Sequence, residues 1–154
     1  MNDFAYDKRK EVVIIKIILF LDDKNGMAFN FRRQSRDETV CLAIMRQCAG
    51  QQIWMNEYSA RLYGRLEGVE IHVAEDFLSQ AGENAYALVE MESLQPFIET
   101  ITELLVFRWN RVYPADVWLD IDLNQWDIVS AVDFVGKSHE KITRILYQRK
   151  DENE

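Results

Sequence analysis

The chain has 154 residues, 48% of them hydrophobic, and a formal net charge of −8. Such a chain can bury a substantial core without a metal or a disulfide, so we expect a single domain over residues 1–154, with a flexible segment at 1–10 and a solvated tail at 150–154. The acidic balance argues against nucleic-acid binding, which needs a basic surface against phosphates. The apolar run at residues 12–21 is too short to span a bilayer, and no cleavage site follows it. We therefore expect a cytoplasmic protein that contacts no membrane.

The first predicted element is a central strand. The run "VVIIKIILFL" at residues 12–21 is β-branched and almost continuously apolar, which is typical of a strand covered on both faces. The next stretch, "SRDE", is a capping box with Ser35 as the cap, and it predicts a helix that runs to about Gln47 and is closed by Gly50. The pattern then predicts a strand at 52–55, a helix capped by Asn56 and ending at Tyr63, and a strand at 69–73.

The second half of the chain continues the alternation and then ends in a hairpin. A helix at residues 92–101 tolerates Pro96 only near its start, where the missing N–H costs little. The other predicted elements are a short helix at 74–81 stopped by Gly82, strands at 85–90 and 103–109, and two long antiparallel strands at 126–134 and 141–149. This order predicts a three-layer α/β fold, with a mixed sheet of about seven to eight strands, flanking helices and a C-terminal antiparallel hairpin.

The sequence carries no metal signature. Cys41 and Cys48 lie two helical turns apart, too far for a disulfide, and fit two core residues of a reducing compartment. The two histidines, His72 and His139, are not placed near them, so no zinc pattern forms. The HxHxDH motif that a ribonuclease Z label would demand is absent, as are a P-loop and a G-x-S-x-G elbow. We therefore expect no metal and disfavour a metal-dependent nuclease.

Two stretches resemble dihydrofolate reductase. The segment "LDDKNGMAFN" at residues 21–30 is similar to the first strand of that family running into its mobile lid loop. The segments "ADVWLDIDLNQWDIVS" at 115–130 and "SHEKITRILYQRK" at 138–150 are similar to its last third. The order and spacing of these stretches, rather than one specific motif, carry the resemblance. It implies a dihydrofolate reductase-like fold with a ligand cleft between the lid loop, the first helix and the carboxyl ends of central strands.

The resemblance also implies an acid at the start of the first helix that binds a pterin. Asp37 is the matching residue and Glu38 is its rival, so these two are the candidate catalytic residues. A buried carboxylate there can accept two parallel hydrogen bonds from an aminopyrimidine-like ring. The alternative is that both are first-turn acids that complement the helix dipole, and it stays open.

The cofactor half departs from the family pattern. The resemblance implies that NADPH phosphates bind at two helix N-termini. Here the first of these turns, "MNEYS", holds Glu57, and the second, "LVEMESL", holds Glu90 and Glu92. A like charge about 4 Å from a phosphate costs roughly 4 kcal/mol at an effective dielectric of about 20. We therefore expect no cofactor, and these three acids disfavour NADPH.

Arginines gather in the lid segment and after the fifth helix-linked strand. Arginine forks bind carboxylates and phosphates at two points, and a neighbouring aromatic ring can stack on a ligand. An anionic small molecule is therefore the expected partner. The candidate ligand-binding residues are Asn25, Met27, Asn30, Arg32, Arg33, Arg36, Arg108, Asn110, Arg111 and Tyr113. The alternative is that these arginines pair with some of the chain's 26 acids and fasten loops together.

A third group of residues matches the contacts that hold the lid in the resembled family. Asp116 and Ser138 match the residues that hydrogen-bond alternately to the lid, and Asn30 matches their partner. His139, in the polar stretch "GKSHEK", is typical of a loop-capping residue, and a catalytic role stays open. Asp116, Ser138 and His139 are therefore the candidate lid-bridging residues, and a gated cleft is expected.

Three functions remain open at this point. The leading one is a cytoplasmic small-molecule-binding protein, enzymatic or not, that recognises an anionic ligand in the lid cleft. The second is a divergent NADPH-dependent reductase of pteridine-like substrates, which is the expected class if the protein is an enzyme. The third is a non-catalytic interaction module whose cleft is filled by Phe29, Phe31 and Trp109. A homodimer through the sheet edge or the terminal hairpin also stays open.

Overall fold

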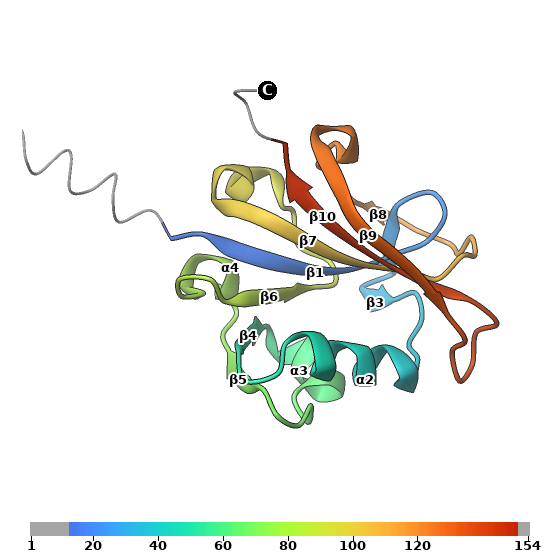
Figure 1. Cartoon of the computed structure of the whole chain (residues 1–154), viewed down its shortest axis with the longest axis horizontal. Helices are drawn as coiled ribbons and strands as arrows, with labels where there is room; N and C mark the ends of the chain where they lie inside the picture. Colours follow the sequence, from blue (N-terminus) through green and yellow to red (C-terminus); the bar gives the residue numbers. More distant parts are fainter. Residues whose placement is uncertain (1–12, 151–154) are drawn as a thin grey trace, which may run out of the picture.

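The structure is a computed structural model that describes residues 13–150 (Figure 1). The predicted flexible segment 1–10 and residues 151–154 of the predicted tail lie outside the described residues. The elements in chain order are β1 (Ile15–Leu21), β2 (Gly26–Phe29), β3 (Arg32–Arg33), α2 (Glu38–Gln47), β4 (Gln52–Met55), α3 (Glu57–Tyr63), β5 (Glu70–Val73), α4 (Phe77–Gln80), β6 (Tyr86–Val89), the 3₁₀ helix η1 (Gln95–Thr100), β7 (Ile101–Arg108), β8 (Val117–Trp118), the 3₁₀ helix η2 (Leu123–Gln125), β9 (Trp126–Phe134) and β10 (Ile142–Arg149).

A seven-stranded mixed sheet in the order β5-β4-β6-β1-β7-β10-β9 forms the centre of the molecule (Figure 1). β1 pairs in parallel with β6 and β7, and β4 pairs in parallel with β5 and β6. β10 runs antiparallel to both β7 and β9, which confirms the predicted terminal hairpin. A second, three-stranded sheet in the order β3-β2-β8 was not predicted, because two of its strands are only two residues long.

The core lies on both faces of the central sheet, as the sequence of β1 predicts. Ile17 and Leu19 belong to one hydrophobic cluster, and Ile18 and Phe20 belong to the other, because successive side chains of a strand point to opposite faces. Residues of α4 and η1 pack in the first cluster, and residues of α2 and α3 pack in the second. Within residues 13–150, no helix combines the length and the apolar character needed to cross a membrane.

Two local predictions about helices were wrong: the residue that caps α2, and the type and bounds of the helix predicted at 92–101. The N-cap of α2 is Asp37 rather than Ser35, and its carboxylate accepts the N–H of Thr39 at 2.9 Å. An ionised carboxylate is the stronger acceptor for an orphan N–H, and it leaves the Ser35 hydroxyl for another partner. The predicted helix at 92–101 is the 3₁₀ helix η1, and β7 starts at Ile101 because that β-branched residue already pairs with β1. The predicted Asn56 cap of α3 is confirmed.

The connections that follow β1 and β6 leave toward opposite faces of the sheet. These strands are neighbours in the sheet, yet β1 continues through α2 on one face and β6 continues through η1 on the other. Such a switch point leaves a crevice outside the strand ends, where ligands bind in open α/β sheets. Asp22 directly follows β1 and Glu90 directly follows β6, so both acids lie at this edge.

Candidate functional site

The arginine loop, residues 22–37, leaves β1 and returns to α2, and Asp22 fixes its base. The buried Asp22 carboxylate accepts the N–H groups of Gly26 at 2.7 Å and Tyr113 at 3.2 Å, and the side-chain amide of Gln34 at 3.0 Å. Burial alone would raise the pKa of Asp22, but these hydrogen bonds hold it below its ordinary value. A Cβ at Gly26 would lie 2.8 Å from Asp22 Oδ2, so only glycine fits against this carboxylate.

Arg33 reaches from the arginine loop to the end of β6. Its Nε and Nη2 atoms lie 2.8 and 3.0 Å from the two carboxylate oxygens of Glu90, whose side chain is 3% exposed. Ser59 of α3 donates to the same carboxylate at 2.8 Å, and the Arg33 guanidinium lies 4.5 Å from the ring centre of Tyr58. Although burial opposes it, Glu90 raises the pKa of Arg33. The Arg33 fork is therefore already occupied by the chain's own carboxylate.

Arg32 and Arg36, by contrast, are exposed. Within residues 13–150, no carboxylate oxygen lies within 4.0 Å of a side-chain nitrogen of either residue. Both line an open pocket of about 470 Å³, which we call the arginine pocket. Its lining residues are Arg32, Arg33, Ser35, Arg36, Tyr58 and Ser138. A neighbouring pocket of about 320 Å³ shares Arg32 and Arg33 with it.

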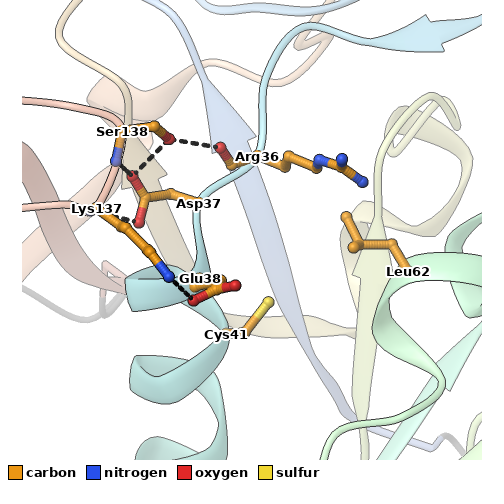
Figure 2. Close-up of a pocket in the computed structure, with 7 residues that line it drawn as sticks. All are labelled: Arg36, Asp37, Glu38, Cys41, Leu62, Lys137 and Ser138. Atoms are coloured by element: carbon orange, nitrogen blue, oxygen red, sulfur yellow. Dashed lines mark hydrogen bonds and ion pairs between the residues drawn. The ribbon is translucent and has the colours of Figure 1, made fainter.

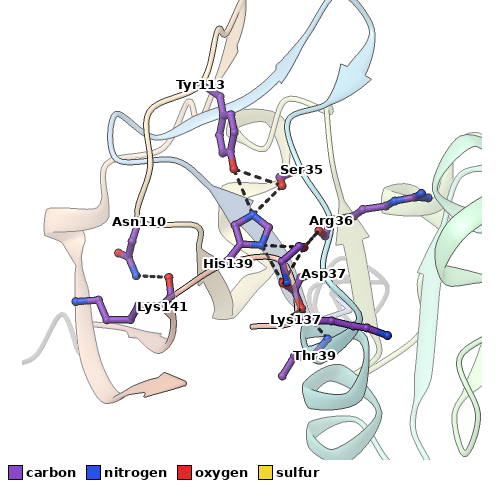
Figure 3. Close-up of polar contacts among 10 residues, drawn as sticks. Ser35, Arg36, Asp37, Thr39, Asn110, Tyr113, Lys137, His139 and Lys141 are labelled. Carbon is purple, nitrogen blue, oxygen red and sulfur yellow. Dashed lines mark hydrogen bonds and ion pairs between the residues drawn. The ribbon is translucent and has the colours of Figure 1, made fainter. Parts of the chain in front are cut away.

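Asp37 is anchored to the hairpin loop, residues 135–141, that joins β9 to β10 (Figure 3). Its side chain is fully buried, and its carboxylate accepts the N–H groups of Lys137 at 2.9 Å and Ser138 at 2.8 Å, as well as His139 Nδ1 at 2.8 Å. Burial would raise the pKa of Asp37, but the hydrogen bond from His139 and those from the backbone hold it well below the usual range. Asp37 is therefore an ionised carboxylate whose oxygens are bound by the protein itself.

Glu38, the rival candidate, lies in different surroundings. It is exposed and forms an ion pair with Lys137 Nζ at 2.8 Å. Asp37 and Glu38 both border a further pocket of about 430 Å³, together with Arg36, Cys41, Leu62, Lys137 and Ser138 (Figure 2). The Arg36 side chain extends away from Asp37 along this pocket, toward Leu62. Arg36 therefore lies on the boundary between this pocket and the arginine pocket.

His139 links Asp37 to Ser35. Its ring stacks on the buried Trp109 with the ring centres 4.7 Å apart, and its Nε2 atom lies 2.8 Å from Ser35 Oγ and 3.2 Å from the Tyr113 hydroxyl. Because Nδ1 faces the Asp37 carboxylate, the network assigns the ring proton to Nδ1 and makes Nε2 the acceptor. The structure thus places Asp37, His139 and Ser35 in one hydrogen-bonded chain (Figure 3).

The sequence pattern did not predict this chain of three residues. Ser35 and His139 are separated by 104 residues, and Ser35 was interpreted only as a helix cap. The signal in the sequence is the dipeptide Ser138–His139 in a polar loop, together with Ser35 two residues before the N-cap acid Asp37. Only the pairing of β10 with β7 and β9 brings the two loops together.

Several predicted ligand residues lie away from the arginine pocket. Met27 is buried in the core, and Arg108 donates to the backbone oxygen of Asp22 at 3.1 Å. Asn110 donates its side-chain amide to the backbone oxygen of Lys141 at 3.2 Å. Arg108 and Asn110 therefore fasten loops at the edge of the sheet where β1, β6 and β7 end.

The backbones of two further candidates also hold loops together. The carbonyl of Asn25 accepts the N–H of Leu119 at 2.9 Å, and the carbonyl of Arg111 accepts the N–H of Asp23 at 2.8 Å. Neither residue lines the arginine pocket.

The lid-bridging candidates lie on both sides of the arginine loop. The N–H of Asn30 donates to the carboxylate of Asp116 at 3.1 Å, and the hydroxyl of Ser138 donates to Asp37 at 3.1 Å. Asn30 and the following Phe31 have φ angles of 52° and 60°, in the left-handed region that non-glycine residues rarely adopt. Asp116 therefore holds the loop at a point where its backbone adopts left-handed φ angles.

The side chains expected to fill the cleft are placed differently. Phe31 is 86% exposed and Phe29 is 48% exposed, so both lie on the surface, whereas Trp109 is buried beneath His139. The ion pair of Arg33 with Glu90 lies instead at the edge of the sheet where β1 and β6 end.

The two helix starts that the resemblance assigns to phosphates are already bonded within the chain. At α3, the N–H of Glu57 donates to the side chain of Glu75 at 3.0 Å, and the N–H of Ser59 donates to Asn56 at 2.8 Å. Asn56 in turn donates to the carboxylate of Glu92 at 2.6 Å.

At η1, Asp120 takes the equivalent position. Its carboxylate accepts the N–H groups of Leu94 at 2.9 Å and Gln95 at 3.4 Å, and it also binds the hydroxyl of Ser93. Neither Glu75 nor Asp120 was singled out in the sequence, because each is distant from the helix start that it caps.

Metal-binding side chains do not cluster in residues 13–150. No group of three or more histidine, cysteine, aspartate or glutamate side chains in that range could hold a metal ion. His72 instead stacks on Trp54 and bonds to Glu70.

Comparison with known proteins supports the fold. No protein-family model matches the sequence, and no curated protein matches it. Among solved structures, the chain is similar to dihydrofolate reductase from Enterococcus faecalis complexed with NADP(H) and RAB-propyl, with 13% sequence identity and a TM-score of 0.63 over 90% of this chain and 97% of that chain. At this identity the likeness shows the fold alone. The chain described here has a divergent dihydrofolate reductase-like fold.

Proposed function

We propose that this protein binds a small anionic molecule in the arginine pocket. The observation that carries the proposal is that Arg32 and Arg36 lie exposed on its wall without a carboxylate partner from residues 13–150. The chain as a whole has 26 acidic and 18 basic residues. Two cations on one pocket wall that lack a carboxylate partner among residues 13–150 form a local positive potential that attracts anions.

The surroundings of these arginines favour a carboxylate or phosphate group on a compact body. Each guanidinium can donate two parallel hydrogen bonds to such a group. Tyr58 adds an aromatic surface on the same wall, while the hydroxyls of Ser35 and Ser138 are already bonded within the chain, to His139 and Asp37. The volume of about 470 Å³ falls in the range of small-molecule sites.

Arg33 has a supporting role in this proposal. Its guanidinium is held by Glu90 and lies over Tyr58, so it fixes the wall from which Arg32 and Arg36 extend. A ligand carboxylate would have to displace Glu90 to use Arg33, which would leave a buried carboxylate without its partner. Arg32 and Arg36 are therefore the recognising residues.

The alternative reductase function requires NADPH, and the helix starts argue against it. Glu75 and Asp120 already accept the N–H groups that would hold phosphates in the family's usual pose. A phosphate brought to either position would meet a carboxylate and lose its backbone donors. We therefore propose that the carboxyl edge serves a smaller anion instead of a dinucleotide.

A thermal-shift screen of the full chain tests the proposal. The panel contains inorganic phosphate, pyrophosphate, citrate, succinate and nucleoside monophosphates at equal ionic strength. At least one anion is expected to raise the melting temperature in a saturable manner, because a ligand that binds only the folded state stabilises it. The shift is expected to be lost in the Arg32→Met/Arg36→Met variant.

The matched control is Arg61→Met/Arg65→Met. It removes the same charge from exposed positions on and just after α3 that do not line the arginine pocket. If both double variants respond to the anion like the wild type, the bound anion lies elsewhere and the assignment of the pocket is wrong.

A further inference from the structure

We propose that Ser35, His139 and Asp37 form a catalytic serine site that hydrolyses a carboxylic ester whose acyl part also carries a separate anionic group. The inference rests on the proposed function in one respect, since Arg32 and Arg36 would hold the anionic end of the substrate. The serine site itself rests on separate observations, namely three side chains in a hydrogen-bonded row and their different degrees of burial.

The geometry is that of a nucleophile, a base and an orienting acid. Ser35 Oγ lies 2.8 Å from His139 Nε2, and His139 Nδ1 lies 2.8 Å from Asp37 Oδ2. Both distances fall in the range at which a base takes a proton from a hydroxyl and a carboxylate holds the base. The same order of roles occurs on unrelated folds, so geometry rather than chain order identifies it.

The base and the acid are held rigidly. The side chains of His139 and Asp37 are 4% and 0% exposed, and the His139 ring lies against Trp109. Backbone N–H groups of Lys137 and Ser138 donate to Asp37 and keep it ionised and oriented. Such a carboxylate fixes the histidine tautomer and stabilises the imidazolium that forms when the base takes a proton.

The nucleophile, in contrast, can be reached from outside. Ser35 is only half-buried and lines the arginine pocket beside Arg32 and Arg36. The Tyr113 hydroxyl lies 3.4 Å from Ser35 Oγ and 3.2 Å from His139 Nε2, so it lies beside both atoms between which the serine proton moves. The nearby guanidinium groups supply positive charge for the oxyanion that develops on the substrate.

The reaction follows from these positions. Ser35 Oγ attacks the ester carbon while its proton moves to His139 Nε2, and the alcohol leaves with that proton as the C–O bond breaks. Water then attacks the acyl-serine, His139 takes a proton from the water, and the proton returns to Ser35 as the acid is released. The net reaction consumes one ester and one water and yields one acid and one alcohol.

Labelling with a neutral fluorophosphonate tests the serine site without relying on anion binding. In this reaction Ser35 Oγ bonds to phosphorus, fluoride leaves, and the serine proton moves to His139. We expect labelling of the folded full chain at Ser35, mapped by mass spectrometry, and a loss of at least about 100-fold in rate in Ser35→Ala. The exposed serine of α4 serves as a control, and Ser79→Ala is expected to label like the wild type.

Two further measurements separate catalysis from a merely structural network. His139→Gln should slow labelling at Ser35 in the folded protein, and 4-nitrophenyl hydrogen succinate should be hydrolysed faster than the neutral 4-nitrophenyl acetate. Absence of labelling at Ser35 in the folded wild type would overturn the inference, whatever the variants do. Labelling without anion binding would contradict the proposed function alone, and anion binding without labelling would contradict the serine site alone.

Discussion

Arg33 and Glu90 form a two-point ion pair that joins the arginine loop to the carboxyl end of β6, across 57 residues of sequence. The pair lies at the edge where the resembled fold has its ligand cleft, and Ser59 completes the hydrogen bonding of the carboxylate. Arg33 thus holds the arginine loop against the end of β6. Arg32 and Arg36 of the same loop form no ion pair with a carboxylate of residues 13–150.

Glu90→Gln should destabilise the protein. The substitution keeps the shape but removes the charge that the half-buried Arg33 faces, and hydrogen bonds to charged groups contribute about 1.5–3 kcal/mol each. We expect the free energy of unfolding in urea to fall by about 2 kcal/mol. The exposed pair of Glu38 with Lys137 provides the control, since Glu38→Gln should cost less than about 1 kcal/mol. Equal losses for the two variants would show that the Arg33 pair is not a fastening contact.

Asp37 should make the stability of the protein depend on pH in the acid range. Its pKa in the folded state lies below the ordinary value of 3.8, so the unfolded chain binds a proton more readily than the folded one. The stabilisation is therefore complete above about pH 4 and is lost as the pH falls below that value. Urea unfolding of Asp37→Asn between pH 3 and 7 should show lower stability at neutral pH and a weaker acid dependence. A wild-type acid dependence in Asp37→Asn would assign the effect to other carboxylates such as Asp22.

The cysteines should react slowly in the native protein. Burial raises the pKa of Cys48 to about 12, and burial together with the charges of Glu38 and Asp37 raises the pKa of Cys41. Because the thiolate is the reactive form, a disulfide reagent at pH 8 should modify both thiols much faster after unfolding. Rapid reaction of the buried Cys48 in the folded chain would mean that the inner face of α2 is open to solvent.

NADPH should not bind in the family's usual pose, because carboxylates occupy both helix starts. Titration of the wild type, followed by quenching of its four tryptophans, is expected to show no saturable signal at micromolar concentrations. The single variants Glu75→Gln and Asp120→Asn are titrated with NADPH in the same way, since each removes the carboxylate charge at one helix start. Micromolar binding by the wild type would instead favour the reductase function.

Much of the fold was predictable because its signals are local. The apolar run of β1, the Asn56 cap of α3 and the two long strands of the hairpin all depend on neighbouring residues, and the structure confirms each of them. Two local predictions failed because a nearby residue was the stronger partner. Asp37, not Ser35, caps α2, and Ile101 pairs with β1 instead of extending the helix before it.

The candidate site was predictable only as separate residues. Asp37, His139 and Tyr113 were each singled out, but Ser35 meets Tyr113 and His139 across 78 and 104 residues of sequence. Glu90 was interpreted as a free charge because its partner Arg33 is in another loop. Contacts of this kind are set by the sheet topology, which sequence periodicity does not specify.

The measurement that tests the central claim most directly is isothermal titration calorimetry with the anion that gives the largest thermal shift. Loss of charged hydrogen bonds worth about 1.5–3 kcal/mol corresponds to a change in affinity of about 10–100-fold. We predict that Arg32→Met/Arg36→Met binds the anion at least about 10-fold more weakly than the wild type, while Arg61→Met/Arg65→Met binds it equally well. Equal affinity of the wild type and the Arg32→Met/Arg36→Met variant would contradict the assignment of the arginine pocket as the anion site.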